Sequence, residues 1–355
     1  MILEKLTLKD FRSYKEREIA FSDKVNIIVG KNAQGKTNIL EAIFFLCLGK
    51  SFRTPREKEV INWTAGESSG YIKGEFKKKY RDIEIEMFFN KDRKKAIKID
   101  GIGIKKIGEL LGSVNVVFFS PDELRLVKDS PDERRRFMNV ILSQTNKRYF
   151  YQVARYEKVL ANRNKLLKTS KDMNALKDTI DIWNRALSDI AQSIYNERQK
   201  LISELAPLAK KAHEYLSGGE QIEVVYKSSF DGENYAEKMM KGLEKNLEKD
   251  YKLGYTTLGI HRDEIDIYLN GVEVKNYGSQ GQQRTTALSL KLAELEIIKN
   301  RVGEEPILLL DDVFSELDSD RRAKLLKFTA KAQTIITTTD LSKGFDKYNI
   351  IKISK

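Results

Sequence analysis

Residues 30–37 are the feature that most restricts how this chain can fold. They read Gly30-Lys31-Asn32-Ala33-Gln34-Gly35-Lys36-Thr37 and match the phosphate-binding pattern G-x-x-x-x-G-K-[ST]. The apolar run before them, residues 25–29, predicts a strand. The residues after them predict a helix, because apolar side chains recur at helical spacing at Ile39, Leu40, Ile43, Phe44 and Cys47. A strand, a glycine loop and a helix in this order predict a nucleotide site in an α/β fold.

Each part of this loop has an expected role. The glycines let backbone N–H groups turn toward phosphate oxygens, and the N-terminus of the following helix adds partial positive charge. Lys36 is expected to reach the β- and γ-phosphates of ATP, and the Thr37 hydroxyl is expected to ligate Mg²⁺. The predicted nucleotide-binding segment extends from Gly30 to Asn38. The alternative is a structural glycine turn that binds no ligand.

Two adjacent carboxylates follow another apolar run. Residues 307–310 are four aliphatic side chains, and Asp311 and Asp312 come directly after them. A central strand of an α/β sheet brings acids to the edge beside the phosphate loop in this way. Asp311 is expected to hold Mg²⁺, directly or through water, and Asp312 to orient the attacking water, so the predicted catalytic residues are Lys36, Asp311 and Asp312. The alternative is that both acids only cap the following turn.

A second loop of small residues precedes a long helix predicted over residues 280–301. It reads Tyr-Gly-Ser-Gln-Gly-Gln-Gln-Arg-Thr over residues 277–285, and a helix N-terminus of this kind can bind phosphate. One such terminus already serves the nucleotide. This second one, shortly before the paired acids, resembles the signature motif of ABC ATPases, and residues 315–318 resemble the D-loop of that superfamily.

Within that superfamily the chain resembles the RecF family of bacterial recombination and gap-repair ATPases, over essentially its whole length. The segments that carry the resemblance are specific only in combination. They are LKDFRSY (8–14), GKNAQGKTN (30–38), GKSFR (49–53), FSP (119–121), RRRF (134–137), GIHRD (259–263) and SQGQQR (279–284).

The resemblance implies an ATP site shared by two copies of the chain. Ser279, Gly281 and Gln282 of one copy would close on phosphates held by Gly35, Lys36 and Thr37 of the other, giving an ATP-dependent homodimer that hydrolysis opens. Transporter ATPases carry a glutamate where this chain has Asp312, and a switch histidine where it has Thr338-Thr339-Asp340. Both differences favour slow turnover. No glutamine near Ser120 matches the Q-loop of the superfamily.

The resemblance also implies partners. They are duplex DNA or duplex/single-strand junctions, the protein RecR and, through it, the recombinase RecA, in recombinational repair and replication-fork maintenance. Two rival functions remain. One is a nucleotide-gated DNA scaffold without catalysis, and the other is the ATP-binding subunit of a membrane transporter, which the missing switch histidine disfavours.

The order of predicted elements suggests one sheet built from both ends of the chain. Residues 70–106 predict an antiparallel β layer, whereas residues 131–215 predict long helices broken near residues 169–174, with Pro207 expected to kink or end the second. The expected fold is therefore an ABC-type P-loop ATPase head of the α/β class with an inserted helical lobe and a short projecting helical hairpin. The predicted ATPase lobe covers residues 1–120 and 300–355, and the helical lobe, which carries the signature motif, covers residues 121–299.

Composition adds a charge argument and a location. The formal net charge is +12, so a polyanion is a plausible partner, although a solvated lysine-rich surface is an equal alternative. The resemblance implies that the β layer contacts DNA, so its basic residues are the predicted DNA contacts, namely Lys77, Lys78, Lys79, Arg81, Arg93, Lys94 and Lys95; the alternative is that these runs are solvated turns. A single cysteine and the lack of a signal peptide or a long apolar run predict a cytoplasmic protein without a membrane partner.

Two further segments have open roles. His261 lies in the GIHRD segment and is expected to be structural or to couple domains rather than to contact a ligand, because two histidines and one cysteine cannot build a metal cluster. Arg134, Arg135 and Arg136 begin a helix, where positive charges oppose the helix dipole. This placement suggests an anionic or subunit partner.

Overall fold

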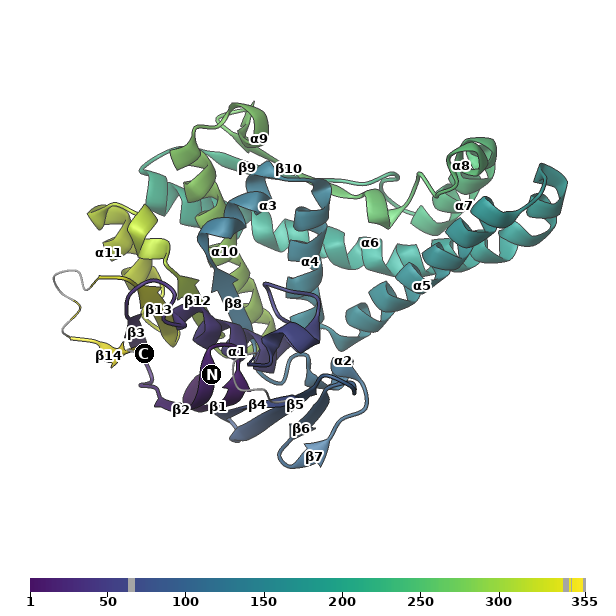
Figure 1. Cartoon of the computed structure of the whole chain (residues 1–355). Helices are drawn as coiled ribbons and strands as arrows, with labels where there is room; N and C mark the ends of the chain where they lie inside the picture. Colours follow the sequence, from purple (N-terminus) through teal and green to yellow (C-terminus); the bar gives the residue numbers. More distant parts are fainter. Residues whose placement is uncertain (63–67, 341–344, 346, 354–355) are drawn as a thin grey trace. The chain divides into compact units, whose positions relative to one another are not determined.

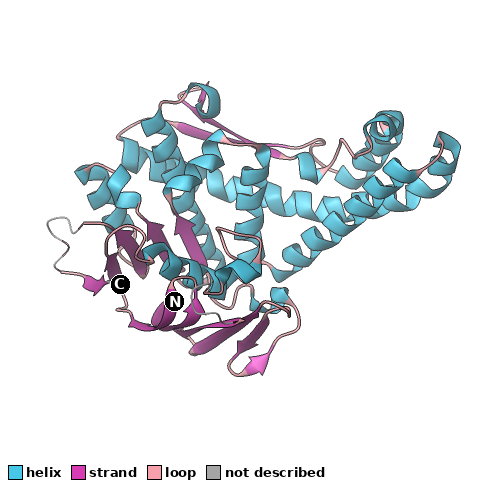
Figure 2. Ribbon diagram, viewed as in Figure 1, coloured by secondary structure: helices cyan, strands magenta, loops and turns pink. Residues whose placement is uncertain are grey.

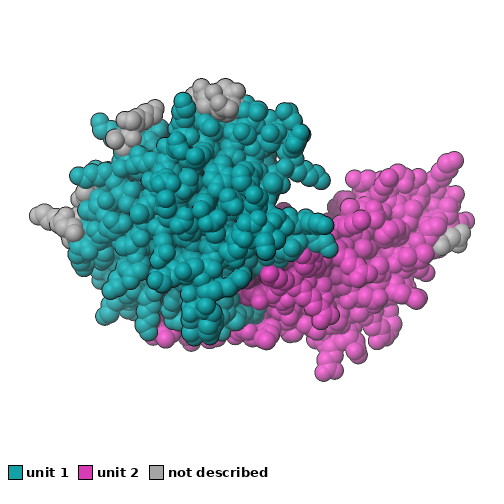
Figure 3. Space-filling model, turned by 90° about the horizontal axis from the view of Figure 1, so that it is seen from below, with its two compact units in different colours: residues 1–123, 215–218, 288–355 teal, residues 124–214, 219–287 magenta. Residues whose placement is uncertain are grey.

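The chain folds into two compact units, and its computed structural model describes residues 1–62, 68–340, 345 and 347–353. The sheet unit comprises Met1–Glu123, Tyr215–Gly218 and Leu288–Lys355, and the helical unit comprises Leu124–Glu214 and Gly219–Ala287 (Figure 3). The predicted boundaries after residues 120 and 299 differ from these most in the helix that begins at Gln280, because its residues from Leu288 onward belong to the sheet unit.

A five-stranded parallel sheet carries the predicted nucleotide loops. Its strand order is β14-β3-β13-β12-β8, and every neighbouring pair is parallel. The strands are β3 (Val25–Val29), β8 (Val116–Phe119), β12 (Ile307–Asp311), β13 (Thr334–Thr338) and β14 (Asn349–Lys352). The central strands are buried along most of their length, which explains why the sequence shows continuous apolar runs there.

A six-stranded antiparallel sheet forms the second layer of the sheet unit (Figure 2). Its order is β2-β1-β4-β5-β6-β7. The strands are β1 (Ile2–Phe11), β2 (Tyr14–Ala20), β4 (Ser69–Lys77), β5 (Ile83–Asn90), β6 (Ala96–Ile99) and β7 (Ile102–Gly103). Buried and more exposed residues alternate along β4, as expected for a sheet with only one face covered.

One helix joins the two layers. Helix α1 (Lys36–Leu48) contacts β4 and β5 of the antiparallel sheet and β8, β12 and β13 of the parallel sheet (Figure 1). Nearly all of its side chains are buried, which is expected of a helix that is apolar on every side. The unit also contains η1 (Glu57–Val60), α2 (Ile107–Leu110), η4 (Val313–Glu316) and α11 (Ser319–Phe328), and η2 (Pro121–Leu124) ends at its boundary.

The helical unit contains most of the remaining elements. Its helices are α3 (Arg125–Lys128), α4 (Pro131–Thr145), α5 (Lys147–Thr169), most of α6 (Met173–Ser217), α7 (Tyr235–Lys245), α8 (Leu247–Leu253), η3 (Ile260–Arg262), α9 (Val274–Tyr277) and the first part of α10 (Gln280–Val302). A small sheet has the order β11-β10-β9, with β9 (Ile222–Lys227), β10 (Glu264–Leu269) and β11 (Val272–Glu273). Within the described residues, no helix is both long and apolar enough to cross a membrane.

Helices α5 and α6 form an antiparallel hairpin. Arg198 Nε of α6 donates to Tyr149 Oη of α5 (3.1 Å), and Arg163 Nε of α5 donates to Asn184 Oδ1 of α6 (2.7 Å). The contact made early in α5 is made late in α6, and the contact further along α5 is made earlier in α6. The two helices are therefore antiparallel. Near the turn between the helices, apolar side chains seal the hairpin: Leu167, Leu176, Ile180 and Leu247.

The prediction that Pro207 kinks or ends its helix is wrong on one point, because α6 continues through it to Ser217. A proline inside a helix removes the donor for the carbonyl four residues earlier. That carbonyl belongs to Ser203, which is exposed, so water can replace the missing hydrogen bond.

A buried ion pair fastens α5 to α8. Arg163 Nη1 donates to Asp250 Oδ2 (2.8 Å), and both side chains are fully buried. The same guanidinium donates to Thr256 Oγ1 (2.7 Å), while Asp250 Oδ1 accepts from the backbone N–H of Thr257 (3.0 Å). Because removing one member strands a buried charge, this pair controls the stability of the hairpin.

We expect Asp250→Ala to destabilise the helical unit by about 3–5 kcal/mol, the cost of leaving one member of a buried ion pair uncompensated. Hydrogen–deuterium exchange of α5 and α6 measures the effect within this unit. Glu248→Ala is the matched control, because it removes an exposed acid from the same helix. Equal exchange in the two variants would contradict the assignment.

Candidate nucleotide site

The phosphate loop connects β3 to α1, as the sequence predicts. Gly35 has a φ of 97°, and a Cβ there would lie 2.7 Å from Ser13 Oγ and 2.8 Å from Tyr14 Oη. At Gly30, a Cβ would lie 2.6 Å from the carbonyl oxygen of Ile353. Both positions therefore require glycine for steric reasons. Burial raises the pKa of Tyr14 to about 12, so its hydroxyl behind the loop stays protonated.

Lys36 lies inside the curve of this loop. Its Nζ donates to the carbonyl oxygens of Gly30 (2.5 Å) and Lys31 (3.0 Å), and Gln34 Oε1 accepts from the N–H of Lys31 (2.6 Å). Burial lowers the pKa of Lys36, and nearby carboxylates oppose that shift, those of Asp312, Asp311 and Asp340. A cation is thus held inside the loop, at the position that would face a bound phosphate.

The paired acids lie at the carboxyl edge of the same sheet. Thr37 Oγ1 donates to Asp311 Oδ1 (3.0 Å), and Thr337 Oγ1 donates to the same oxygen (2.6 Å). Register explains the contact, because Asp311 is opposite Thr337 and Thr337 is opposite Ile28, near the end of β3. Burial raises the pKa of Asp311, while the two threonine hydroxyls oppose that shift.

Asp312 has an unusual environment. Its φ is 51°, and its N–H donates to Thr337 Oγ1 (3.0 Å). Its Oδ1 is buried and has no hydrogen-bond partner among the residues that the structure describes. Its side chain makes no cap hydrogen bond to the turn that follows, and the Asp311 carboxylate is used by two threonines. The hydrogen bonds therefore give no support to the capping alternative.

A buried carboxylate behind the loop escaped the sequence argument. Glu41 on α1 is fully buried and accepts two hydrogen bonds from Arg12, at 2.9 Å from Nε and 2.6 Å from Nη2, and one from Ser51 Oγ (2.5 Å). Arg53 Nη1 donates to Asn38 Oδ1 (2.9 Å), at the first turn of α1. Segments 8–14 and 49–53, which the sequence connected only through resemblance, therefore meet at this helix. The sequence signal for a buried, paired carboxylate was an acid, Glu41, within an otherwise apolar helix.

The second glycine loop belongs to the helical unit and begins α10. The N–H of Ser279 donates to Gln282 Oε1 (2.9 Å), and the N–H of Gln282 donates to Ser279 Oγ (3.3 Å). This reciprocal pair is a capping box that fixes the helix start. Ser279 and Gly281 are exposed, and a Cβ on Gly281 would meet nothing within 4 Å. The chain thus presents a rigid, exposed helix N-terminus with room for a ligand.

Comparison with known proteins identifies the family. The family described as RecF/RecN/SMC N terminal domain matches residues 2–353. The DNA replication and repair protein RecF of Alkaliphilus oremlandii is 43% identical over 346 residues, which cover 96% of this chain and 93% of that protein. The protein of the same name from Clostridium perfringens is 44% identical over 352 residues, covering 98% and 96%. The chain belongs to the RecF family.

Solved structures agree with this assignment. One described as the recombination mediator protein RecF-ATPrS in the RecFOR pathway has a TM-score of 0.91 and 35% identity, and covers 99% of this chain and 96% of that one. An SMC head domain from Pyrococcus furiosus has a TM-score of 0.56 at 20% identity, covering 95% and 89%, and shares the fold. The predicted family and the predicted fold class, an ABC-type ATPase head, are confirmed.

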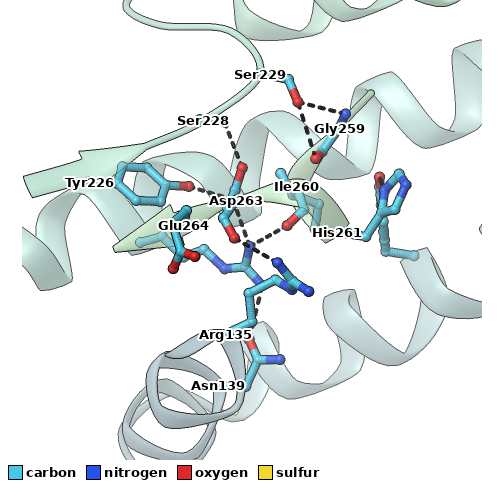
Figure 4. A network of polar contacts seen from close by, with 12 residues as sticks. Arg135, Asn139, Tyr226, Ser228, Ser229, Gly259, Ile260, His261, Asp263 and Glu264 are labelled. Carbon is cyan, nitrogen blue, oxygen red and sulfur yellow. Dashed lines mark hydrogen bonds and ion pairs between the residues drawn. The ribbon is translucent and has the colours of Figure 1, made fainter. Parts of the chain in front are cut away.

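The GIHRD segment of this RecF-family chain forms a polar network inside the helical unit (Figure 4). Asp263 is buried, and its carboxylate accepts from Arg198 Nη1 (2.6 Å), Tyr226 Oη (2.6 Å) and Ser228 Oγ (2.7 Å). Arg135 Nη1 donates to the backbone oxygen of Asp263 (2.8 Å). The segment therefore holds α4, α6 and β9 together.

The arginine cluster is part of the same packing. Arg134 is 3% exposed and donates to both carboxylate oxygens of Glu264, at 2.5 Å and 2.8 Å. Its other nitrogen donates to the carbonyls of Leu126 (3.1 Å) and Asp129 (3.0 Å). The expectation of an external anionic or subunit partner is wrong for Arg134, because Glu264 neutralises it within the unit. Arg136 is half exposed and pairs with Glu133 (3.7 Å).

The basic residues predicted to contact DNA divide into two groups. Four have a partner within the sheet unit: Lys78 with the carbonyl of Ser113 (2.6 Å), Lys95 with the carbonyl of Gly49 (2.7 Å) and the carboxylate of Glu57, Lys77 with Glu4 (3.9 Å), and Arg81 with Asp100 (3.6 Å). The side chains of Lys79, Arg93 and Lys94 are exposed. Lys78 and Lys95 thus serve the packing of the β layer, and the exposed members remain candidates.

His261 uses both ring nitrogens within the helical unit. Nε2 lies 3.1 Å from the carbonyl oxygen of Thr256, which can only accept, so Nε2 carries the hydrogen. Nδ1 then accepts from Tyr156 Oη (2.9 Å). Burial lowers the pKa of His261 to about 4. These contacts favour the structural role over ligand contact.

This pKa predicts a pH dependence. A histidine in the unfolded chain has a pKa near 6.5, whereas His261 in the folded protein has a pKa of about 4 and stays neutral above that pH. The free energy of unfolding of the helical unit should therefore be unaffected by His261 above pH 6.5. It should fall by up to about 3 kcal/mol as the pH drops from 6.5 to 4, because only the unfolded chain then binds the proton. Urea unfolding of wild type and His261→Gln from pH 7 to pH 4 measures it. We expect a flatter pH dependence in the variant, and parallel curves would contradict the assignment.

Proposed function

We propose that this chain is a slow ATPase that binds DNA in recombinational repair and replication-fork maintenance, and that ATP closes two copies into a clamp. Family membership supports the activity, because RecF-family proteins are ABC-type ATPases and the curated relatives are named DNA replication and repair proteins. A second solved relative, 35% identical, is described as the recombination mediator RecF-ATP in the RecFOR pathway.

One observation carries the proposal: the hydroxyl of Thr37 donates to the carboxylate of Asp311 across the parallel sheet. This contact joins the phosphate loop to the acids that ATP hydrolysis requires. Lys36 binds the β- and γ-phosphates, and the backbone N–H groups of residues 30–37 cradle them. Asp312, whose free oxygen is buried beside this contact, orients the attacking water and accepts its proton.

The same residues fit Mg²⁺. Hard cations take oxygen ligands, and Mg²⁺ is usually held by one or two carboxylates together with substrate phosphates and water. Thr37 and Asp311 would hold it, and no group of three or more acidic, histidine or cysteine residues among the described ones offers a fuller cage. The bound ion supplies positive charge that offsets the charge of the phosphates.

The second half of the site comes from another copy. Ser279, Gly281 and Gln282 form an exposed, capped helix N-terminus, which is suited to a γ-phosphate presented by a partner. In a two-fold dimer such contacts occur in pairs, so two equivalent ATP sites form together. Hydrolysis removes the shared phosphate and opens the clamp.

The proposed partners follow from the family. They are duplex DNA or duplex/single-strand junctions, RecR and, through RecR, RecA, and the proposed location is the cytoplasm. The exposed Lys79, Arg93 and Lys94 of the β layer are candidate DNA contacts, with Lys77 and Arg81 beside them. Their contribution depends on charge, and it should weaken as salt concentration rises.

We expect Lys36→Ala to abolish ATP-dependent dimerisation. Removing one charged hydrogen-bond donor should weaken ATP binding roughly 10- to 100-fold, because such bonds are worth about 1.5–3 kcal/mol. Light scattering after size exclusion, with and without ATP and Mg²⁺, measures the dimer.

Lys24→Ala is the matched control, because Lys24 is exposed and lies directly before the first residue of β3, at the end of the strand away from the phosphate loop. It should dimerise with ATP as wild type does. If the Lys36→Ala chain still forms ATP-dependent dimers, the shared-site proposal is wrong.

A further inference from the structure

Helix α5 has a strongly one-sided charge. Over Lys147–Thr169 it carries seven basic side chains and a single acid, Glu157. One of the basic residues, Arg163, is buried and neutralised by Asp250. The other six are exposed: Lys147, Arg148, Arg155, Lys158, Lys165 and Lys168. Most of the positive charge of this helix therefore faces solvent.

Helical spacing gathers the exposed charges on one face. Lys147, Tyr151, Arg155, Lys158 and Lys165 follow one another at intervals of four, four, three and seven residues, which places them on one side of a helix. We call these five residues the α5 stripe. The opposite side packs into the unit through side chains that are buried: Tyr149, Tyr156, Arg163 and Leu167.

Three of the cations in the α5 stripe lack an acidic partner among the described residues. Some bases on other helices pair with an acid one turn away: Arg136 with Glu133, Lys241 with Glu237 and Lys324 with Asp320. By contrast, Arg155, Lys158 and Lys165 form no ion pair with any residue that the structure describes. A row of unpaired like charges repels itself, and an anionic partner relieves that repulsion.

We propose that the α5 stripe binds the phosphate backbone of duplex DNA. From Lys147 to Lys165 it extends about 27 Å at 1.5 Å per residue, which approaches one turn of duplex, about 34 Å. Its exposed tyrosine, Tyr151, is 42% accessible and can donate to a phosphate oxygen between the cations. This inference rests on the proposed DNA-binding function and adds a second contact surface to the β layer.

The chemistry of the stripe favours phosphate contacts over base recognition. Its cations are mostly lysines, which act as point charges. Asn162 is the one amide side chain that helical spacing places on this face, whereas base recognition typically uses several such groups. Such a surface binds any sequence and depends steeply on salt. The alternative occupant, an acidic protein surface, becomes an outcome of the test.

The test compares two triple variants of the full-length chain with wild type. The stripe variant is Arg155→Gln, Lys158→Gln and Lys165→Gln. The control is Lys200→Gln, Lys210→Gln and Lys211→Gln, which removes the same charge from exposed positions of α6. Fluorescence anisotropy with a labelled duplex, in ATP and Mg²⁺, gives the dissociation constant across a salt series. Equilibrium dialysis with ATP checks that nucleotide binding is intact.

Wild type and control should show the same slope of log affinity against log salt. In the stripe variant the slope should be shallower by about 2.7, because three phosphate contacts are lost and each contributes about 0.9. ATP binding should be equal in all three. A stripe variant with the wild-type slope and affinity overturns the proposal and leaves an acidic protein surface as the alternative occupant of the stripe. If wild type itself binds no duplex, the proposed DNA function fails instead.

Discussion

The contact between Thr37 and Asp311 is the interaction on which the rest of the site depends. The two residues are 274 positions apart in sequence, and their hydrogen bond forms because β3, β13 and β12 are adjacent parallel strands that end at one edge. Thr337, on the strand between them, donates to the same carboxylate and accepts from the backbone of Asp312. Any shift in strand register would separate the phosphate loop from the acids.

Both units contain buried charged side chains that are paired with a side chain of opposite charge. In the sheet unit, Glu41 is fully buried and is satisfied by Arg12 and Ser51, which fixes the helix that begins at Lys36. In the helical unit, Arg163 pairs with Asp250 and Arg198 with Asp263. Such pairs are costly to break, so they specify one arrangement of neighbouring helices.

The sequence predicted the features that depend on local pattern. The strand before Gly30, the helix from Lys36, the strand before Asp311 and the helix from Gln280 all appear in the structure, because periodicity and glycine placement determine them locally. The predicted site residues of the sheet unit also meet at one edge, since parallel strands end there.

Other features depended on contacts that no local pattern encodes. The partner of Glu41 could not be read from the sequence, because Arg12 is 29 residues away and is connected only by the fold. Helix α6 continues through Pro207, and Ser203, whose carbonyl loses its donor there, is an exposed residue. The α5 stripe does not form a consecutive basic run in the sequence, because its members recur at helical spacing and other residues separate them.

The central claim is that each ATP site needs two copies of the chain. Its most direct test is the ATPase rate of an equal mixture of Lys36→Ala chains and Ser279→Arg chains, with duplex DNA present. Each variant alone should be inactive, whereas the mixture should recover activity, up to about half of the wild-type rate, because only mixed dimers carry an intact site and each has one intact site of two. No recovery in the mixture, or full activity of Ser279→Arg alone, would contradict the account.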